Sequence, residues 1–266
     1  LSVDETVSEK IFRKNPRSEK TIIQGQGPDE ITIIGHVGID ETNRRFFVSD
    51  HGKLKIFAYD LDSVLTTPEY QPSVKIDMKK KLFPDDYLYL NDTLCIAKII
   101  EPIGNNDYKP SVARWNMATG EINPMPYEYP DLKKVRFIYA ASAEHQLYVQ
   151  CYTQYDLMTI CDFNGNLKCN IYGPKWVNEK TQTQHYSLGV EFCGDKILAL
   201  YSGGDHRTDA YYPTKFLVFD LNGNYLKTLE TGYMITDFCY DKENNRLIIN
   251  LNDEIQFTYL DLEGII

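Results

Sequence analysis

The sequence predicts an all-β protein, a six-bladed β-propeller with four-stranded antiparallel blades, and three observations support this fold class. A short motif recurs at a mean spacing of about 50 residues, which is the repeat length of propeller blades. Short apolar segments alternate with turns rich in Gly, Asn and Asp, as in a protein built from hairpins. A convincing period of 3.6 residues never lasts beyond a few residues, so little helix is expected.

The recurring motif is an apolar strand that ends in an aromatic residue or leucine, followed by Asp or Asn, an apolar residue and a turn with Gly. Its central positions are Asp60, Asn116, Asp162, Asp220 and Asp261. We expect a structural role for the motif Asp, because a carboxylate at this point accepts backbone hydrogen bonds within the turn.

Each repeat divides into four short strands. The expected first strands are 31–40, 87–91, 135–143, 188–193 and 235–241, and the second strands are 45–50, 93–100, 146–152, 196–201 and 246–251. The motif belongs to the third strand, and a more polar fourth strand follows its turn. Turns such as Asn164-Gly165 and Asn222-Gly223 have the residues that tight hairpins favour.

The repeats predict one propeller domain over residues 1–266. Successive blades are expected at 29–79, 80–132, 133–184, 185–232 and 233–266, after a partial first blade at 1–28. Residues 1–28 match the second, third and fourth strands of a repeat and lack the innermost one, so we expect the natural chain to begin before Leu1. The alternative is five blades, with the N-terminal residues adding an outer strand to the last blade.

Composition excludes several classes of partner. The net charge of −10 opposes binding to the phosphates of nucleic acid, and no apolar run approaches the ~20 residues of a membrane-spanning helix. The six cysteines all fall in strand-like segments, which favours buried thiols over a disulfide framework. A three-residue turn would place Cys161 opposite Cys169, so a cross-strand disulfide is the alternative for this pair.

One short segment resembles a known family. Residues Gly25-Gln26-Gly27-Pro28-Asp29-Glu30 resemble the Gly-x-Gly-Pro-x-Glu junction between the first and second blades of TolB-like six-bladed propeller proteins of Bacteroidetes. A looser similarity extends over the chain through its strand rhythm and the element Phe219-Asp220-Leu221-Asn222-Gly223. The resemblance implies an exported protein of the periplasm or outer membrane, commonly a lipoprotein anchored through a lipid-modified cysteine upstream of this chain, often without known biochemical activity.

Binding is expected on one face of the propeller. In a four-stranded blade, the loops between the second and third strands and the loops between blades emerge on the same side, and long loops on a rigid scaffold usually carry function. These loops are residues 25–30, 50–53, 101–110, 153–156, 174–186 and 202–213.

Two of these loops contain most of the candidate binding residues, because aromatic and charged side chains suit contact with a protein or a sugar. The predicted binding residues are His51, Trp176, His185, Asp205, His206, Arg207, Tyr211 and Tyr212. The competing interpretations are a solvated loop at 202–213 and, for Trp176, a lid packed over its own blade.

A catalytic signature is missing from the sequence. There is no Gly-x-Ser-x-Gly element, the glycines at 25 and 27 lack the helix that a phosphate-binding loop requires, and metal ligands do not recur between blades. His145 is expected on a turn at the opposite face. We therefore predict no metal and no cofactor.

The predicted function is a non-enzymatic propeller that binds a protein or carbohydrate partner. The alternative is a hydrolase or lyase for a glycan or peptide, with His36, His185 or His206 as acid or base and Asp205 or Asp209 as the orienting carboxylate. An inert scaffold that spaces other proteins is a third hypothesis.

Overall fold

The computed structural model describes residues 30–68, 70–77, 82–104, 107–132, 134–208 and 211–266. Within them the chain forms five antiparallel sheets, four with four strands and one with three. This architecture confirms the predicted all-β propeller with four-stranded antiparallel blades. The predicted partial blade at 1–28 lies outside the described residues. The chain divides into two compact units, residues 1–124 and 125–266, which are described separately.

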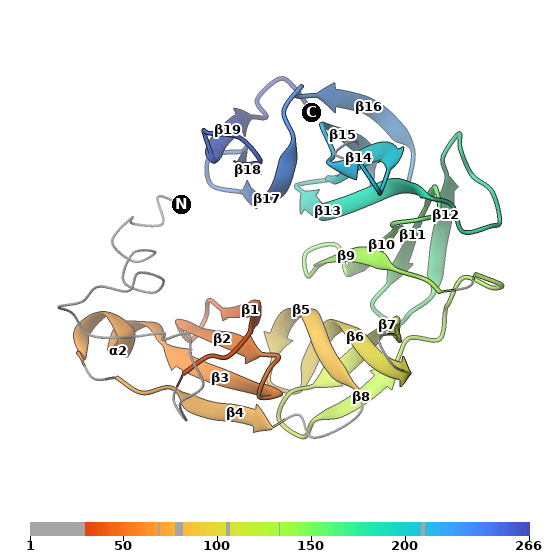
Figure 1. Ribbon diagram of the computed structural model, residues 1–266. Coiled ribbons are helices and arrows are strands. Elements are labelled where there is room, and N and C mark those ends of the chain that lie inside the picture. The colour runs from red at the N-terminus through yellow and green to blue at the C-terminus, as the bar shows by residue number, and fades with distance from the viewer. Residues whose placement is uncertain (1–29, 69, 78–81, 105–106, 133, 209–210) are drawn as a thin grey trace. The chain divides into compact units, whose positions relative to one another are not determined.

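The first unit contains two sheets whose strands pair in chain order (Figure 1). The strands are β1 (Ile34–Asp40), β2 (Arg45–Asp50), β3 (Lys55–Asp60) and β4 (Ser73–Asp77), followed by β5 (Phe83–Asn91), β6 (Leu94–Gly104), β7 (Asp107–Asn116) and β8 (Glu121–Pro124). Phe47, Tyr87 and Trp115 are buried in one cluster to which both sheets contribute. The two sheets therefore pack face to face, as neighbouring blades do.

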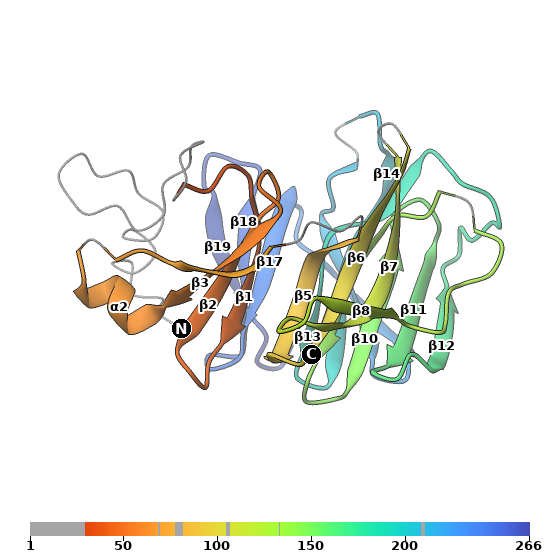
Figure 2. The ribbon, with the colours of Figure 1, turned by 90° about the horizontal axis from the view of Figure 1, so that it is seen from below.

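The second unit contains three sheets. The strands are β9 (Phe137–Ser142), β10 (Leu147–Tyr152), β11 (Leu157–Asp162) and β12 (Leu167–Tyr172), then β13 (Thr183–Cys193), β14 (Lys196–Asp205), β15 (Lys215–Asp220) and β16 (Tyr225–Glu230), and finally β17 (Ile235–Asp241), β18 (Arg246–Leu251) and β19 (Phe257–Asp261). In Figure 2, strands β10, β11 and β12 lie side by side with their connections at the two ends of the sheet. Each sheet thus presents one set of loops at each end.

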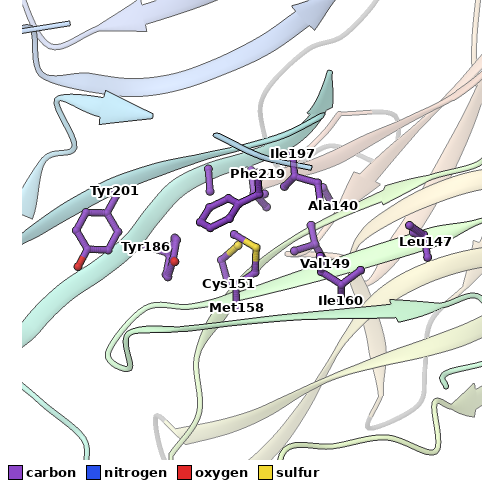
Figure 3. Packing of buried hydrophobic residues seen from close by; sticks show 12 residues of the cluster. Ala140, Leu147, Val149, Cys151, Met158, Ile160, Tyr186, Ile197, Tyr201 and Phe219 are labelled. Atoms are coloured by element: carbon purple, nitrogen blue, oxygen red, sulfur yellow. The ribbon is translucent and has the colours of Figure 1, made fainter. Parts of the chain in front are cut away.

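The second unit has one core cluster between the β13–β16 sheet and the β17–β19 sheet, and another between the β9–β12 sheet and the β13–β16 sheet (Figure 3). Val149, Cys151 and Ile160 come from one sheet, and Ile197 and Phe219 from the other. Figure 3 shows Tyr201 at one end of this cluster and Leu147 at the other. This packing fixes the ends of β10 and β14, from which the loops of the candidate site extend.

The motif Asp residues have the predicted structural role. Asp162 Oδ1 accepts the backbone N–H groups of Asn164 and Asn166 at 2.8 and 2.9 Å. Asp220 does the same for the residues at equivalent positions in the next sheet, both at 2.8 Å. Each turn also needs a glycine in the left-handed region, and Gly165 and Gly223 have φ values of 81° and 85°.

One helix departs from the expected four-strand pattern. Helix α2 (Leu61–Thr66) lies between β3 and β4 and is capped by Asp60, whose Oδ1 accepts the Ser63 N–H at 2.7 Å. The carboxylate satisfies one of the N–H groups that every helix leaves unpaired at its start, so the motif Asp here caps a helix.

Several strands are longer than predicted, and the expected loops are correspondingly shorter. The 101–110 segment was expected as a loop, yet β6 and β7 continue to pair as far as Gly104 opposite Asp107. Strands β13 and β14 likewise pair as far as Thr183 opposite Asp205. In both hairpins the paired strands extend beyond the apolar segments of the sequence, because the backbone hydrogen bonds between strands do not require apolar side chains.

The predictions for cysteine need two corrections. Cys169 lies opposite Ile160, and Cys161 lies opposite Leu167, because a register shift interrupts the β11–β12 ladder and undoes the expected Cys161–Cys169 alignment. All six cysteines are free, and Cys239 is exposed, contrary to the expected burial. Burial raises the pKa of Cys161 to about 11, which keeps this thiol protonated at neutral pH.

Candidate functional site

The most distinctive surface of the second unit is a group of aromatic rings around Trp176. Trp176 lies in the loop between β12 and β13, residues 173–182, which we call the Trp176 loop. The rings of Tyr129, Tyr155 and Tyr172 have their centroids 5.8, 6.3 and 5.1 Å from that of Trp176. Tyr155 is buried beneath the group, whereas Tyr172 is 50% exposed. We call Tyr129, Tyr172 and Trp176 the aromatic surface.

Hydrogen bonds and packing hold the aromatic surface in one arrangement. The hydroxyls of Tyr129 and Tyr172 lie 3.3 Å apart, and this hydrogen bond raises the pKa of Tyr129 to about 12. Edge-to-face pairs of aromatic rings add about 0.5–1.5 kcal/mol beyond the area that they bury. Trp176 is therefore presented as a preformed contact rather than as a free side chain.

A buried carboxylate ties down the start of the Trp176 loop. Asp156, which precedes β11, is 1% exposed, and its Oδ2 accepts the Lys175 N–H at 2.9 Å. The Asp156 carbonyl accepts the Gly173 N–H at 2.8 Å. A Cβ at position 173 would lie 2.1 Å from the Asp156 carboxylate, so only glycine allows this approach.

The other end of the loop is held by Thr181. Its N–H and hydroxyl both donate to the Gln154 carbonyl, at 3.3 and 3.1 Å. His185 then places its Nε2 3.4 Å from Thr181 Oγ1. Both ends of the loop are consequently attached to the short 153–156 connection between β10 and β11.

His185 belongs to a buried polar cluster that also contains Asp156 and Tyr201. His185 is 1% exposed, and its Nδ1 lies 3.3 Å from Tyr201 Oη and 3.7 Å from Asp156 Oδ1. Burial lowers the pKa of His185, although the Asp156 charge opposes this shift. Burial and the same carboxylate raise the pKa of Tyr201. The cluster is closed to solvent and supports the loop from below.

The second predicted loop follows β14. The Arg207 guanidinium donates to both oxygens of Asp205, through Nε at 2.9 Å and Nη2 at 2.5 Å. This hydrogen-bonded arginine holds the pKa of Asp205 far below its usual range. His206 Nδ1 lies 2.8 Å from the Gln182 carbonyl, so Asp205 and His206 are engaged by protein groups while the Arg207 side chain is 67% exposed.

The two loops are connected to one another. Besides the His206–Gln182 contact, Lys175 Nζ donates to the Gly203 carbonyl at 3.3 Å. Tyr211 and Tyr212, also expected to bind, have ring centroids 4.2 Å apart and contact each other. The predicted residue Asp209 lies outside the described residues. The structure therefore links Trp176, His185, Asp205, His206 and Arg207 through neighbouring segments.

The remaining predicted residues lie in the first unit. The ring of His51 packs against Gly35, where an added Cβ would approach within 2.3 Å, and its Nε2 is buried without a hydrogen-bond partner in the described part of the chain. His36 Nδ1 pairs with Asp86 Oδ1 at 3.0 Å and is 25% exposed. His51 is thus a packing residue, and His36 contacts the Asp86 carboxylate separately from the loops of the second unit.

Some members of the site were not identified from the sequence. The sequence gives no sign of the roles of Asp156, Tyr129, Tyr172 and Tyr201, because their contacts are with residues distant in the chain. Asp156 alone carries a partial signal, since it falls in a short loop that the repeat pattern places on the predicted face. Within the described ranges, no group of three or more His, Cys, Asp or Glu side chains is arranged to hold a metal ion. The Asp205 carboxylate is occupied by Arg207.

Comparison with known proteins agrees with the fold. The profile of the domain family DUF5128, described as a 6-bladed beta-propeller, matches residues 11–93. The described residues contain five blades. A search of curated proteins gives no match. The TolB-like resemblance of residues 25–30 stays a prediction.

Solved structures similar to this chain include three chains at low sequence identity. One is the extracellular domain of a protein assigned to a one-component system in B. thetaiotaomicron, with a TM-score of 0.57 and 12% identity over 91% of this chain and 29% of that one. A member of the DUF4221 family from Bacteroides vulgatus has a TM-score of 0.57 and 12% identity, covering 90% and 82%. A chain of the nidogen/laminin complex has a TM-score of 0.56 and 11% identity, covering 88% and 78%.

These similarities concern the fold alone. The chain spans 29% of the length of the B. thetaiotaomicron structure, so the activity of that whole protein does not transfer. A helix long and apolar enough to cross a membrane is not found among the described residues.

Proposed function

We propose that the protein is a non-enzymatic binding module of the cell envelope that holds a protein partner through the aromatic surface and the adjoining Arg207. The observation that carries this proposal is the packing of Trp176 among Tyr129, Tyr155 and Tyr172 on a loop attached at both ends. Trp, Tyr and Arg are the residues that most often dominate the free energy of protein–protein contacts, and rigid presentation lowers the entropy lost on binding.

A protein partner agrees with the composition of the surface better than a glycan does. Val177, which follows Trp176 in the chain, is 47% exposed and adds apolar area to the Trp176 loop. The exposed Arg207 adds a planar donor on the loop that His206 connects to Gln182 of the Trp176 loop. A mixed apolar and arginine surface is typical of the centre of protein interfaces.

The acid–base hypothesis has less support from the geometry. His185 is 1% exposed and faces Tyr201 and Thr181, and the Asp205 carboxylate is bound by Arg207. The exported location rests on the resemblance described above and on similarity to extracellular domains of the same fold.

The test is quantitative binding with matched variants. Protein captured by the purified chain from an envelope extract is identified, purified and titrated against wild type, Trp176→Ala, Arg207→Ala and the control Tyr225→Ala. Tyr225 is 55% exposed, close to the 50% of Tyr172, and lies at the start of β16, beside the turn after β15. We expect Trp176→Ala to weaken binding by about 30-fold or more, in line with a hot-spot residue, and Tyr225→Ala to have little effect.

Two outcomes would overturn the proposal. Equal binding by wild type and Trp176→Ala would exclude the aromatic surface as the contact. Trp176-dependent binding of purified envelope glycans, with no protein ligand, would establish a carbohydrate-binding module in its place.

A further inference from the structure

Strand β19 lies at the open edge of the three-stranded sheet. In each of the other four sheets the third strand is covered by a fourth antiparallel strand, which is β4, β8, β12 or β16. β19 pairs with β18 on one side, and no strand pairs with its other side among the residues that the structure describes. The backbone N–H and C=O groups along such an edge can pair with a further strand.

The side chains at this edge are apolar and exposed. Ile255, Phe257 and Tyr259 are the three most exposed large hydrophobic residues of the described ranges, at 62% to 69%. Phe257 and Tyr259 alternate with Leu260, which packs on the core cluster shared with the β13–β16 sheet, so the two rings lie on the opposite face. Apolar side chains gathered in the open are typical of a contact site.

β19 lacks the residues that discourage pairing in the other outer strands. Each of the four outer strands contains a lysine or a proline, and these are Lys75, Pro124, Lys168 and Lys227. Lysine and proline at a sheet edge disfavour the addition of another strand. The sequence of β19 is Phe-Thr-Tyr-Leu-Asp, with neither residue. The outer strands thus have the features of a sheet edge, whereas β19 has those of a strand with two neighbours.

The pair β15–β16 indicates which segment fits beside β19. When the two sheets are aligned through the motif Asp, Val218 of β15 corresponds to Tyr259. Val218 pairs with Lys227 of β16. A segment like β16 therefore places a lysine opposite Tyr259 and its second leucine opposite Phe257. Apolar pairs and a lysine beside an aromatic ring both stabilise neighbouring strands.

The charges around β19 also favour a segment that carries lysine. Residues 247–266 contain four acidic side chains and no lysine or arginine. The acidic residues occur on both sides of the exposed aromatic rings, and all four are exposed: Asp253, Glu254, Asp261 and Glu263. Arg246 lies over the Tyr259 ring at 5.2 Å but is paired with the Asp241 carboxylate. A positive segment is therefore complementary to this edge.

We propose that the outer edge of β19 binds an extended segment of a partner protein, which carries lysine among apolar residues and pairs as a fourth antiparallel strand. The backbone hydrogen bonds provide affinity, and Phe257 and Tyr259 select the side chains of the segment. Because residues 1–28 are predicted to supply strands of a further blade, the segment is assigned to another polypeptide. This surface belongs to a different sheet from the aromatic surface around Trp176.

Titration of the full chain with a peptide tests the proposal. The probe is a synthetic peptide with the sequence of residues 224–230, which contains the whole of β16. Hydrogen–deuterium exchange locates its binding, and fluorescence anisotropy of a labelled copy gives its affinity. We expect the peptide at saturation to slow exchange at residues 256–261 by about threefold or more.

Two controls separate strand pairing from adhesion to an apolar surface. The peptide with Thr228→Pro cannot complete the backbone pairing, so we expect it to bind at least about tenfold more weakly. In the protein, Tyr259→Lys places a like charge opposite the peptide lysine and should weaken binding by about tenfold, whereas Tyr225→Lys should not. Both tyrosines are exposed, so neither substitution removes core packing.

The outcomes separate the possible occupants of the edge. Protection at 256–261 that falls with the proline peptide and with Tyr259→Lys supports the proposal. No protection there at millimolar peptide, or equal binding in either control, would overturn it. Slower exchange of the same residues at rising protein concentration without peptide would assign the edge to a second copy of the chain. Trp176→Ala should bind the peptide as wild type does, so a failure here leaves the proposed function intact.

Discussion

At the scale of single residues, buried carboxylates fix the loops of both units. Asp50 is completely buried, and its two oxygens accept the backbone N–H groups of Thr32, Ile33, Gly52 and Lys53 at 2.9 to 3.2 Å. Burial acts to raise the pKa of Asp50, but these four hydrogen bonds together hold it below its usual value. The side chain replaces the partners that these N–H groups would find in water.

Asp50→Ala should lower the free energy of unfolding by about 2–4 kcal/mol, because it leaves several buried N–H groups without acceptors. The depressed pKa means that the Asp50 contribution is complete above the unfolded value of 3.8 and is lost as pH falls through the lower folded value. Urea titrations at about pH 7 and about pH 3 measure both effects. An Asp50→Ala protein that loses as much stability on acidification as wild type would contradict the assignment.

Gly173→Ala tests the support of the aromatic surface. An added Cβ would lie 2.1 Å from the Asp156 carboxylate, so we expect a loss of about 1–3 kcal/mol in stability and weaker partner binding. Gly104→Ala is the matched control, since nothing lies within 4 Å of its added Cβ. We expect Gly173→Ala to melt at a lower temperature than Gly104→Ala. Equal melting temperatures would show that the close approach between Gly173 and the Asp156 carboxylate is not needed for stability.

Sequence patterns reveal some of these residue roles and not others. The turn role of Asp162 and Asp220 was predictable, because a local motif specifies both donor and acceptor. The roles of Asp156 and Tyr201 were not, because their partners come from segments that only the packed sheets bring together. His185 was predicted as a binding residue on the loop-rich face, but it is buried. The sequence around a single histidine in a strand does not indicate which distant residues will cover it.

At the scale of elements, two of the hairpin turns share the same hydrogen bonds. The turns after β11 and β15 have the same sequence pattern, Asp-x-Asn-Gly-Asn. In each, the Gly is left-handed and the second Asn donates from its side chain to the Asp. The first strands and second strands of most repeats were placed correctly to within a few residues, whereas the ends of β6, β7, β13 and β14 were not. Apolar alternation predicts a buried ladder, and the ends of β6 and β14 are extended without being buried.

Asp162→Ala and Asp220→Ala should therefore lower the melting temperature by similar amounts. Each substitution removes the carboxylate that accepts hydrogen bonds from two backbone N–H groups and from one Asn side-chain amide. Asn at either position keeps part of the capping ability and should restore part of the loss. A large effect at one turn and none at the other, measured by calorimetry, would show that the turns are not equivalent.

At the scale of the whole molecule, the described residues contain five sheets, and the matched family is described as six-bladed. The prediction that residues 1–28 supply part of a further blade remains a prediction. If it is right, a chain that starts at residue 29 should melt at a lower temperature than the 266-residue chain and bind more of a dye for exposed apolar surface. Identical melting curves would place those residues outside the cooperative fold.

The measurement that most directly tests the central claim is a hydrogen–deuterium exchange footprint of the captured partner on the full chain, read peptide by peptide with Trp176→Ala in parallel. We expect the partner to protect the backbone amides of residues 127–132 and 172–182 from exchange, with smaller changes at 205–212. None of these changes should occur in Trp176→Ala. Protection confined to the turns at the opposite ends of these sheets, such as 143–146 and 163–166, would contradict it.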